Sequence, residues 1–268
     1  MEKEQLIKKL DIFMNQARQA NCYFSIIKQF LENRSNYPDE MSLSSAFYSF
    51  TYNALVVSTF MELAKIYDSH KYSTNIQKLF KECKENISYF PTFHSEHEIT
   101  IDGKKHAYTL PFTHIVKEEE KDFFKSEIEK KRSFRELLGT SDSPFQVEMT
   151  IERFFDLYEW RLSKLELQIG NLLKQRNKVY AHNDEATMNT NIDDVIKKFS
   201  LNYEEIEKLI AFALDFCQFA YAMLTGINKS SAPINIDDWQ NTLMLTKLGE
   251  KYQDIEVEKQ VEDFKNSL

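Results

Sequence analysis

The chain has 268 residues, of which 42% are hydrophobic and 28% charged, and its net charge is −8. This length suits one large domain or two small ones, and the hydrophobic share can cover a sizeable core. Only five glycines and five prolines occur. Because strand-rich folds use these residues in turns, we expect long helices with short connections. The negative net charge opposes nucleic acid at long range, so a polyanion site has to be a local cationic patch.

Cysteine usage and hydropathy indicate the compartment. Cys22, Cys83 and Cys217 lie far apart in the sequence, and their odd number argues against a disulfide framework. The first residues mix charged with apolar side chains, and no stretch reaches the ~18 consecutive apolar residues that a membrane-spanning helix needs. We therefore expect a cytoplasmic protein that does not use a membrane as a partner.

The apolar residues of the first third of the chain predict three helices. From Lys3 to Glu32 they recur at mostly three- or four-residue steps with charges between them, which predicts one long amphipathic helix. The segment from Ser42 to Tyr67 is apolar on more than one face, as expected of the central, buried helix of a bundle. A shorter helix is predicted from Thr74 to Asn86.

The helical pattern then gives way to strand signals. Ile99 and Ile101 alternate with polar residues, and Asp102-Gly103 stands between two such runs. This arrangement predicts a β-hairpin. A highly charged helix follows the hairpin and ends at Gly139.

Helices resume in the second half of the chain. The longest pattern runs from Glu148 to Ala181, which at ~1.5 Å per residue could reach ~50 Å. A polar loop leads to a strongly apolar helix from Tyr203 to Leu224, which Gly226 ends. A final helix starts at Asp237 and becomes highly charged towards its end. The expected fold is all-α, a bundle of five to seven helices with one small β-hairpin.

This pattern also suggests a domain organisation. We expect one helical domain over residues 1–226, into which the hairpin and the charged helix, at about residues 89–145, are inserted. Residues 227–268 are expected to form a C-terminal helical extension.

The end of the longest helical pattern carries the sequence QRNKVYAHNDE, from Gln175 to Glu185. The cations Arg176, Lys178 and His182 would offset the negative end of a helix dipole, which is a purely structural explanation. A generic helix end, however, requires neither Asn directly after Arg nor an Ala-His-Asn-Asp exit into a polar loop. The segment is therefore a candidate functional site.

This segment resembles the ribonuclease members of the HEPN superfamily. Those proteins carry Arg, four to six residues and then His, usually with a polar residue directly after the Arg; Arg176, Asn177 and His182 match this pattern with five residues between Arg and His. The segment is similar in particular to the AbiU-type abortive-infection branch. The stretch ELAKIYD, from Glu62 to Asp68, looks like a helix end of the same branch. The resemblance covers most of residues 1–226 and does not account for the hairpin or the C-terminal helix.

The resemblance implies a HEPN-like fold and a metal-independent endoribonuclease of toxin or antiviral type. RNA can be cut without a metal ion when its 2′-hydroxyl attacks the adjacent phosphate, so neither a metal nor another cofactor is expected, and DNA should remain intact. His182 can exchange protons near neutral pH, and Arg176 offers an always charged planar fork for phosphate oxygens. Asn177 would orient either partner.

The neighbours of these residues complete the expected site. Asp184 would hold the His182 ring, and Lys174 and Lys178 would bind flanking phosphates of the RNA. On a continuous α-helix, Arg176 and His182 stand about 120° apart, so one chain would hold half a site. The family accordingly implies a homodimer that brings both copies of the motif into one cleft. An antitoxin or another defence-system protein is a further expected partner.

Two alternatives stay open. Four histidines near the hairpin could bind a transition metal together with two glutamates (His94, His97, His106, His114, Glu96 and Glu98). Residues i and i+3 of a strand point to opposite faces, however, so we predict no metal site and interpret them as polar hairpin residues or a docking surface. The whole chain could also be a non-catalytic module that binds RNA, a nucleotide or a partner protein, which its acidic charge and the unexplained insertion favour.

Overall fold

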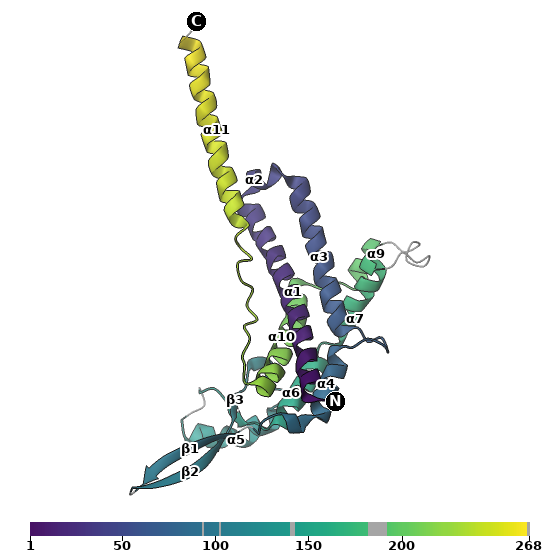
Figure 1. The fold of residues 1–268 in the computed structure, drawn as a ribbon, viewed down its shortest axis with the longest axis vertical. Coiled ribbons are helices and arrows are strands. Elements are labelled where there is room, and N and C mark those ends of the chain that lie inside the picture. Colours follow the sequence, from purple (N-terminus) through teal and green to yellow (C-terminus); the bar gives the residue numbers. More distant parts are fainter. Residues whose placement is uncertain (93, 102, 140–142, 182–191, 267–268) are drawn as a thin grey trace. The chain divides into compact units, whose positions relative to one another are not determined.

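A computed structural model describes the chain except residues 93, 102, 140–142, 182–191 and 267–268, and except the side chains of 94–97, 108–111 and 181. The fold is all-α with two small antiparallel sheets of two strands each among the described residues, as predicted (Figure 1). The chain forms two compact units. The first unit contains residues 1–11, 76–167 and 215–229; the second contains residues 12–75, 168–214 and 230–268.

The second unit is a helical bundle. It contains α1 (Lys3–Asn36) from Ile12 onward, which the short α2 (Pro38–Ser42) connects to α3 (Ser45–Tyr67), and these helices lie side by side (Figure 1). The part of α10 (Tyr203–Thr225) up to Leu214 completes this core, where the buried hydroxyl of Tyr67 donates to the Leu209 carbonyl at 2.7 Å. Because α3 ends at this buried tyrosine, the following residues are held at a fixed place.

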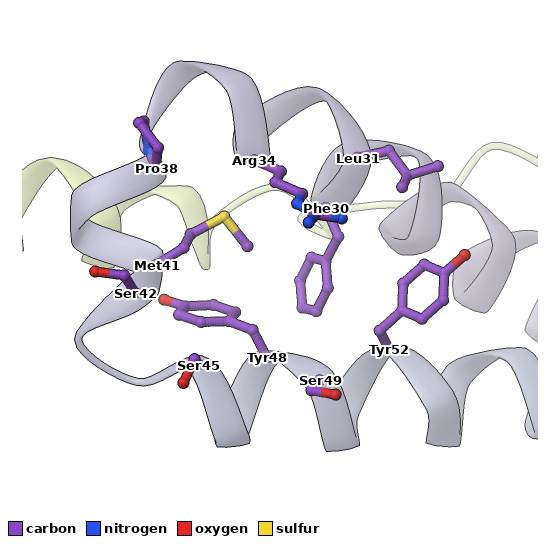
Figure 2. Close-up of a pocket in the computed structure, with 10 residues that line it drawn as sticks. All are labelled: Phe30, Leu31, Arg34, Pro38, Met41, Ser42, Ser45, Tyr48, Ser49 and Tyr52. Atoms are coloured by element: carbon purple, nitrogen blue, oxygen red, sulfur yellow. The ribbon is translucent and has the colours of Figure 1, made fainter.

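A pocket of about 570 Å³ lies where α1, α2 and α3 meet. Phe30 of α1 and Tyr48 and Tyr52 of α3 point into it, as Figure 2 shows. The Phe30 ring also packs against Trp239 at 4.5 Å between centroids, and the Trp239 indole donates to Gln29. These contacts hold the chain just before α11 (Gln240–Asn266) against α1.

The first half of α3 differs from its prediction as a buried central helix. Only the residues from Thr59 onward contribute to the core, whereas Phe47 and Phe50 are 62% and 76% exposed. The apolar composition of this half therefore does not arise from burial against neighbouring helices of the same chain. Residues 42–44, which were predicted to begin this helix, belong to α2 and to the turn before α3.

The first unit contains the hairpin and its surroundings. The strands β1 (His94–Ile101) and β2 (Lys104–Pro111) pair antiparallel with Ile99 opposite His106, which confirms the predicted hairpin. Gly103 at the turn has a φ of +76°, a conformation that glycine adopts without strain. The strands β3 (Thr113–Ile115) and β4 (Gln146–Glu148) form the second sheet.

A small core connects this second sheet to the following helices. The residues that build it are Val116, Phe124, Phe145, Val147, Met149 and Leu157. Most of them come from the segments around the second sheet. Phe124 lies between the short η2 (Glu118–Glu120) and α5 (Lys125–Leu137), and Leu157 belongs to α6 (Ile151–Ser163). The unit also contains α4 (Ile76–Glu85) and η1 (Ile87–Tyr89).

The prediction of one continuous helix from Glu148 to Ala181 is wrong. The chain forms α6, then α7 (Glu166–Gln175), and then a π-helical turn, η3 (Arg176–Ala181). A break at Lys164-Leu165 separates α6 from α7, and Leu165 is nevertheless buried. The apolar periodicity continues through this break, which explains why the sequence does not reveal it.

The predicted number of helices, five to seven, is also too low. The described residues form ten α-helices, because the longest pattern is divided and because α2 and α9 (Ile192–Lys198) are short additional helices. Among the described helices, α10 alone has the length and composition of a membrane span, and 56% of its most apolar window is buried inside the structure. Its apolar side chains therefore serve the protein core.

Candidate functional site

An ion pair joins the two segments that carried the family resemblance. The Nη2 of Arg176 lies 3.2 Å from the Oδ2 of Asp68, and the two side chains are 18% and 28% exposed. Asp68 directly follows the last residue of α3, and Arg176 is the first residue of η3. The arginine of the motif is thus held against the end of another helix of the second unit.

The carboxylate of Asp68 is fixed by its own turn. Its Oδ1 accepts a hydrogen bond from the backbone N–H of His70 at 3.0 Å, and its carbonyl accepts one from the Asn75 side chain at 2.7 Å. Burial acts to raise the pKa of Asp68, but the His70 N–H, the Arg176 guanidinium and the Ser73 hydroxyl together lower it below its usual value. Asp68 is therefore ionised at neutral pH and holds the guanidinium in place.

The guanidinium of Arg176 keeps hydrogen-bonding capacity. Its Nε is buried and has no hydrogen-bond partner among the described residues. A guanidinium has five N–H groups, and a buried donor without an acceptor is costly. The site therefore contains an unsatisfied donor close to its central ion pair.

The π-helical turn changes the expected geometry of the motif. Its backbone closes i→i+5 rather than i→i+4, so each residue advances by less than the 100° on which the expected 120° separation rests. Because His182 lies outside the described residues, the expected separation of Arg176 and His182 stays a prediction. The Tyr180 ring packs against Phe60 of α3 at 5.0 Å between centroids. The turn is thus attached to α3 at both Arg176 and Tyr180.

Four of the six predicted site residues lie among the described residues. Lys174 lies in the last turn of α7, Arg176 is the first residue of η3, and Asn177 and Lys178 of η3 are exposed. His182 and Asp184, the expected proton-transfer residue and its partner, lie outside the described residues. The acid–base part of the site therefore stays a prediction.

A cluster of three lysines surrounds Phe199, and the sequence analysis included only two of them. The ammonium groups of Lys174, Lys178 and Lys198 lie 4.7, 5.9 and 5.6 Å from the centre of the Phe199 ring. The buried Gln175 side chain donates to the Phe199 carbonyl and ties this ring to α7. We call these residues the lysine cluster. Lys198 was missed because it is the last residue of α9, far from the motif in sequence.

Two of the six residues considered for a metal near the hairpin have other partners in the described structure. His114 bonds through its Nε2 to the buried carboxylate of Glu120 at 2.7 Å, and Glu98 pairs with Lys105 at 3.0 Å. The side chains of His94, Glu96 and His97 lie outside the described residues. Within the described part of the chain, no group of three or more His, Cys, Asp or Glu residues is arranged to hold a metal ion.

Comparison with known proteins gives the class of this chain. A family model described as AbiU2, of the HEPN class, matches residues 3–242. The fold and this match define an HEPN-type protein of abortive-infection type, as the sequence motifs predict. Within that class, the chain belongs to the AbiU2 family. No match was found among curated proteins or among solved structures.

Proposed function

We propose that this protein is a metal-independent endoribonuclease of toxin or antiviral type. The ion pair between Arg176 and Asp68 carries the proposal, because it holds the motif arginine in a defined orientation, two residues in sequence from Lys174 and from Lys178 of the lysine cluster. A pre-oriented guanidinium can bind the phosphate oxygens of RNA and stabilise the charge that develops when the phosphate is attacked. Lys174 and Lys178 would hold the neighbouring phosphates.

The reaction follows from these groups and His182. One His182 takes the proton from the 2′-hydroxyl, whose oxygen then attacks the adjacent phosphorus. The bond from phosphorus to the 5′-oxygen breaks, and a second protonated histidine supplies the proton that this oxygen needs. The products are a 2′,3′-cyclic phosphate and a 5′-hydroxyl group. Asn177 orients one of the reacting groups, and Asp184 holds the His182 ring.

A homodimer would supply the second histidine, and the exposed face of α3 supports it. Four residues at alternating steps of three and four form this face: Phe47, Phe50, Ala54 and Val57, with Leu43 preceding them in the same series. No charged residue occurs from Ser42 to Met61. We call this series the α3 stripe. Exposed apolar surfaces of this kind mark interfaces, and this spacing is that of paired helices.

The two possible orientations of paired α3 helices differ in where the sites would lie. Antiparallel pairing about Phe50 would separate the two Asp68 residues by roughly 54 Å, at ~1.5 Å per residue. Parallel pairing in register brings both helix ends, and both ion pairs, to the same end of the dimer. A shared cleft therefore requires parallel pairing, with the α3 stripe of each copy facing that of the other.

RNA cleavage in the presence of EDTA tests the proposal. Purified protein is incubated with single-stranded RNA, and the chain ends of the products are identified. Cyclic phosphate ends from an EDTA-resistant reaction would support it, with no cleavage of RNA that has a 2′-deoxy group at the cut position. Cleavage that requires an added metal ion would contradict it. Binding without cleavage would favour the alternative, a non-catalytic module for RNA, a nucleotide or a partner protein.

A partner protein, such as an antitoxin or a defence-system component, also belongs to this proposal. The described residues of α11 from Lys251 onward are all exposed, and they include Tyr252, Ile255 and Phe264. A long helix that presents apolar residues to solvent is a suitable surface for another protein.

A further inference from the structure

A second pocket of about 370 Å³ is lined in part by Gln175 and Tyr180, on either side of the motif arginine in sequence. Its walls come from α1, α3, the end of α7, η3, α9, the segment before α10 and the start of α10. The residues that the following argument uses are Phe24, Tyr52, Phe60, Gln175, Tyr180 and Tyr203. Gln175, which lines the pocket, directly precedes Arg176, which forms the ion pair with Asp68.

The walls of this pocket are aromatic and uncharged. Five aromatic rings line it, and no charged side chain belongs to its described lining. Phe24 and Phe60 are buried, and Tyr180 packs on Phe60, so these rings form a fixed wall. A wall of this kind fits a planar, uncharged ring that can stack on it.

A pair of tyrosine hydroxyls gives this pocket polar groups. The hydroxyls of Tyr52 and Tyr203 lie 2.9 Å apart. Burial, together with this hydrogen bond, raises the pKa of Tyr52 to about 12, so the hydroxyl remains neutral at physiological pH. Neutral hydroxyls can both donate to and accept from the polar edge of a heterocycle.

The lysine cluster adjoins this pocket. Gln175 and Ser200 line the pocket, and the residue between α9 and Ser200 is Phe199, around which the three lysines lie. The hydrogen bond from the Gln175 side chain to the Phe199 carbonyl holds the lysine cluster at the edge of the pocket. An uncharged aromatic pocket next to three ammonium groups matches the two parts of a nucleotide, the base and the phosphate.

We propose that this pocket binds one unstacked nucleobase of single-stranded RNA, while the lysine cluster, including Lys198, binds the phosphate next to it. The inference rests on the proposed function and adds its substrate class, because an unpaired base is required at the site. The base stacks on Tyr180. Paired RNA keeps its bases within the helix, so it is a poorer ligand.

The test uses a short single-stranded RNA with 2′-O-methyl groups, which cannot be cut, and one fluorescent 2-aminopurine base. Binding to the wild-type protein should quench the 2-aminopurine fluorescence, since the base stacks on an aromatic side chain. Tyr180→Leu should remove the quenching and weaken binding by roughly five- to hundredfold, as expected for one lost stacking contact. Tyr180→Phe keeps the ring and should retain both signals.

A second pair of variants tests phosphate binding by the lysine cluster. Lys198→Ala should weaken binding and lower the salt dependence of the affinity, whereas Lys197→Ala, at the exposed neighbouring lysine outside the cluster, should do neither. Circular dichroism confirms that each variant is folded. If the wild-type protein binds and cuts RNA without quenching, or if Tyr180→Leu binds as tightly, the pocket does not hold a base. If the wild-type protein neither binds nor cuts RNA, the proposed function fails as well.

Discussion

The carboxylate of Asp68 holds the guanidinium of Arg176 at 3.2 Å, although the two residues belong to helices far apart in the sequence. Asp68 is in turn held by the His70 N–H. Three groups are thus arranged in series, a backbone amide, a carboxylate and a guanidinium. This arrangement makes Asp68 a positioning residue, whose loss should affect the orientation of Arg176 and leave its charge unchanged.

We expect Asp68→Asn to lower the RNA cleavage rate by about tenfold, because the guanidinium loses its charged partner and moves away from the productive orientation. Substrate affinity should change little, since Arg176 and the lysines remain. Single-turnover kinetics separate these two quantities. Asp39→Asn, at an exposed acidic residue of α2, is the matched control and should cut at the wild-type rate.

The same ion pair should affect stability in a pH-dependent way. The pKa of Asp68 is lowered in the folded protein, so its contribution is fully present above the unfolded pKa of about 3.9 and is lost as the pH falls through the lower folded value. The stability difference between the wild type and Asp68→Asn should therefore be constant from pH 7 to about pH 5 and shrink below about pH 4. Urea titrations at several pH values measure it, and a difference that grows on acidification would contradict the assignment.

The motif residues should be required for cleavage without being required for folding. His182→Ala should lose at least the ~10²-fold that one positioned proton-transfer group contributes. Arg176→Ala should lose a comparable or larger factor, because charge is removed from the transition state. The rates are measured with EDTA present. A folded, dimeric His182→Ala protein that cuts RNA at the wild-type rate would reduce the motif to a charged helix terminus.

Cysteine substitutions on the α3 stripe test the dimer and its orientation together. In a parallel dimer, Val57→Cys should form a disulfide-linked dimer with itself under mild oxidation. In an antiparallel dimer, Val57→Cys should instead cross-link with Leu43→Cys when the two variants are mixed. Non-reducing gel electrophoresis distinguishes the outcomes. The native Cys83 and Cys217 are buried and Cys22 is partly buried, so the wild type under the same conditions is the control.

A charge within the same stripe should separate the copies. Phe50→Glu places a carboxylate at a 76% exposed position in the middle of the stripe and should convert the dimer to a monomer at micromolar concentration. Leu137→Glu makes the same chemical change at an exposed position of α5 and should remain dimeric. Light scattering gives the masses, and a dimeric Phe50→Glu protein would place the interface elsewhere.

The first unit offers an independent prediction about stability. Glu120 is 1% exposed, and its carboxylate accepts hydrogen bonds from His114 and from the Lys117 N–H. Burial acts to raise the pKa of Glu120, but these hydrogen bonds lower it below its usual value. Glu120→Gln should therefore destabilise the protein by about 2 kcal/mol at pH 7, because a charge-assisted hydrogen bond is lost.

The sign of its pH dependence follows from the lowered pKa. The contribution of Glu120 is present above the unfolded pKa of about 4.3 and disappears as the pH falls through the folded pKa. Glu118→Gln changes an exposed residue of the same short helix and should shift stability by less than about 0.5 kcal/mol at any pH. Equal effects of the two substitutions would show that burial of Glu120 is unimportant.

The sequence predicts the parts of this fold that local chemistry determines. The hairpin follows from Asp102-Gly103 between alternating residues, and the all-α class follows from helical periodicity and few glycines. The break at Lys164-Leu165 escapes such reasoning because both helices keep the same apolar spacing across it. Similarly, the composition of α3 does not show whether its apolar residues face a core or solvent.

The candidate site is predictable to a similar extent. Arg176, Asn177, Lys174 and Lys178 follow from the motif, and ELAKIYD, the segment that contains Asp68, follows from the family resemblance. The contact between Asp68 and Arg176 is long-range, and neither spacing nor composition specifies it. Lys198 joins the lysine cluster through the fold alone, because the hydrogen bond of Gln175 to Phe199 is what brings α9 to the motif.

The π-helical turn at Arg176–Ala181 also bears on how such motifs tolerate changes in length. A π turn holds one more residue than an α turn between the same two hydrogen-bonded positions. A chain with one residue fewer after the arginine could close an ordinary α turn and continue in nearly the same direction. The π turn therefore accommodates the extra residue locally. The contact between Arg176 and the end of α3 does not depend on the exact number of residues that follow Arg176.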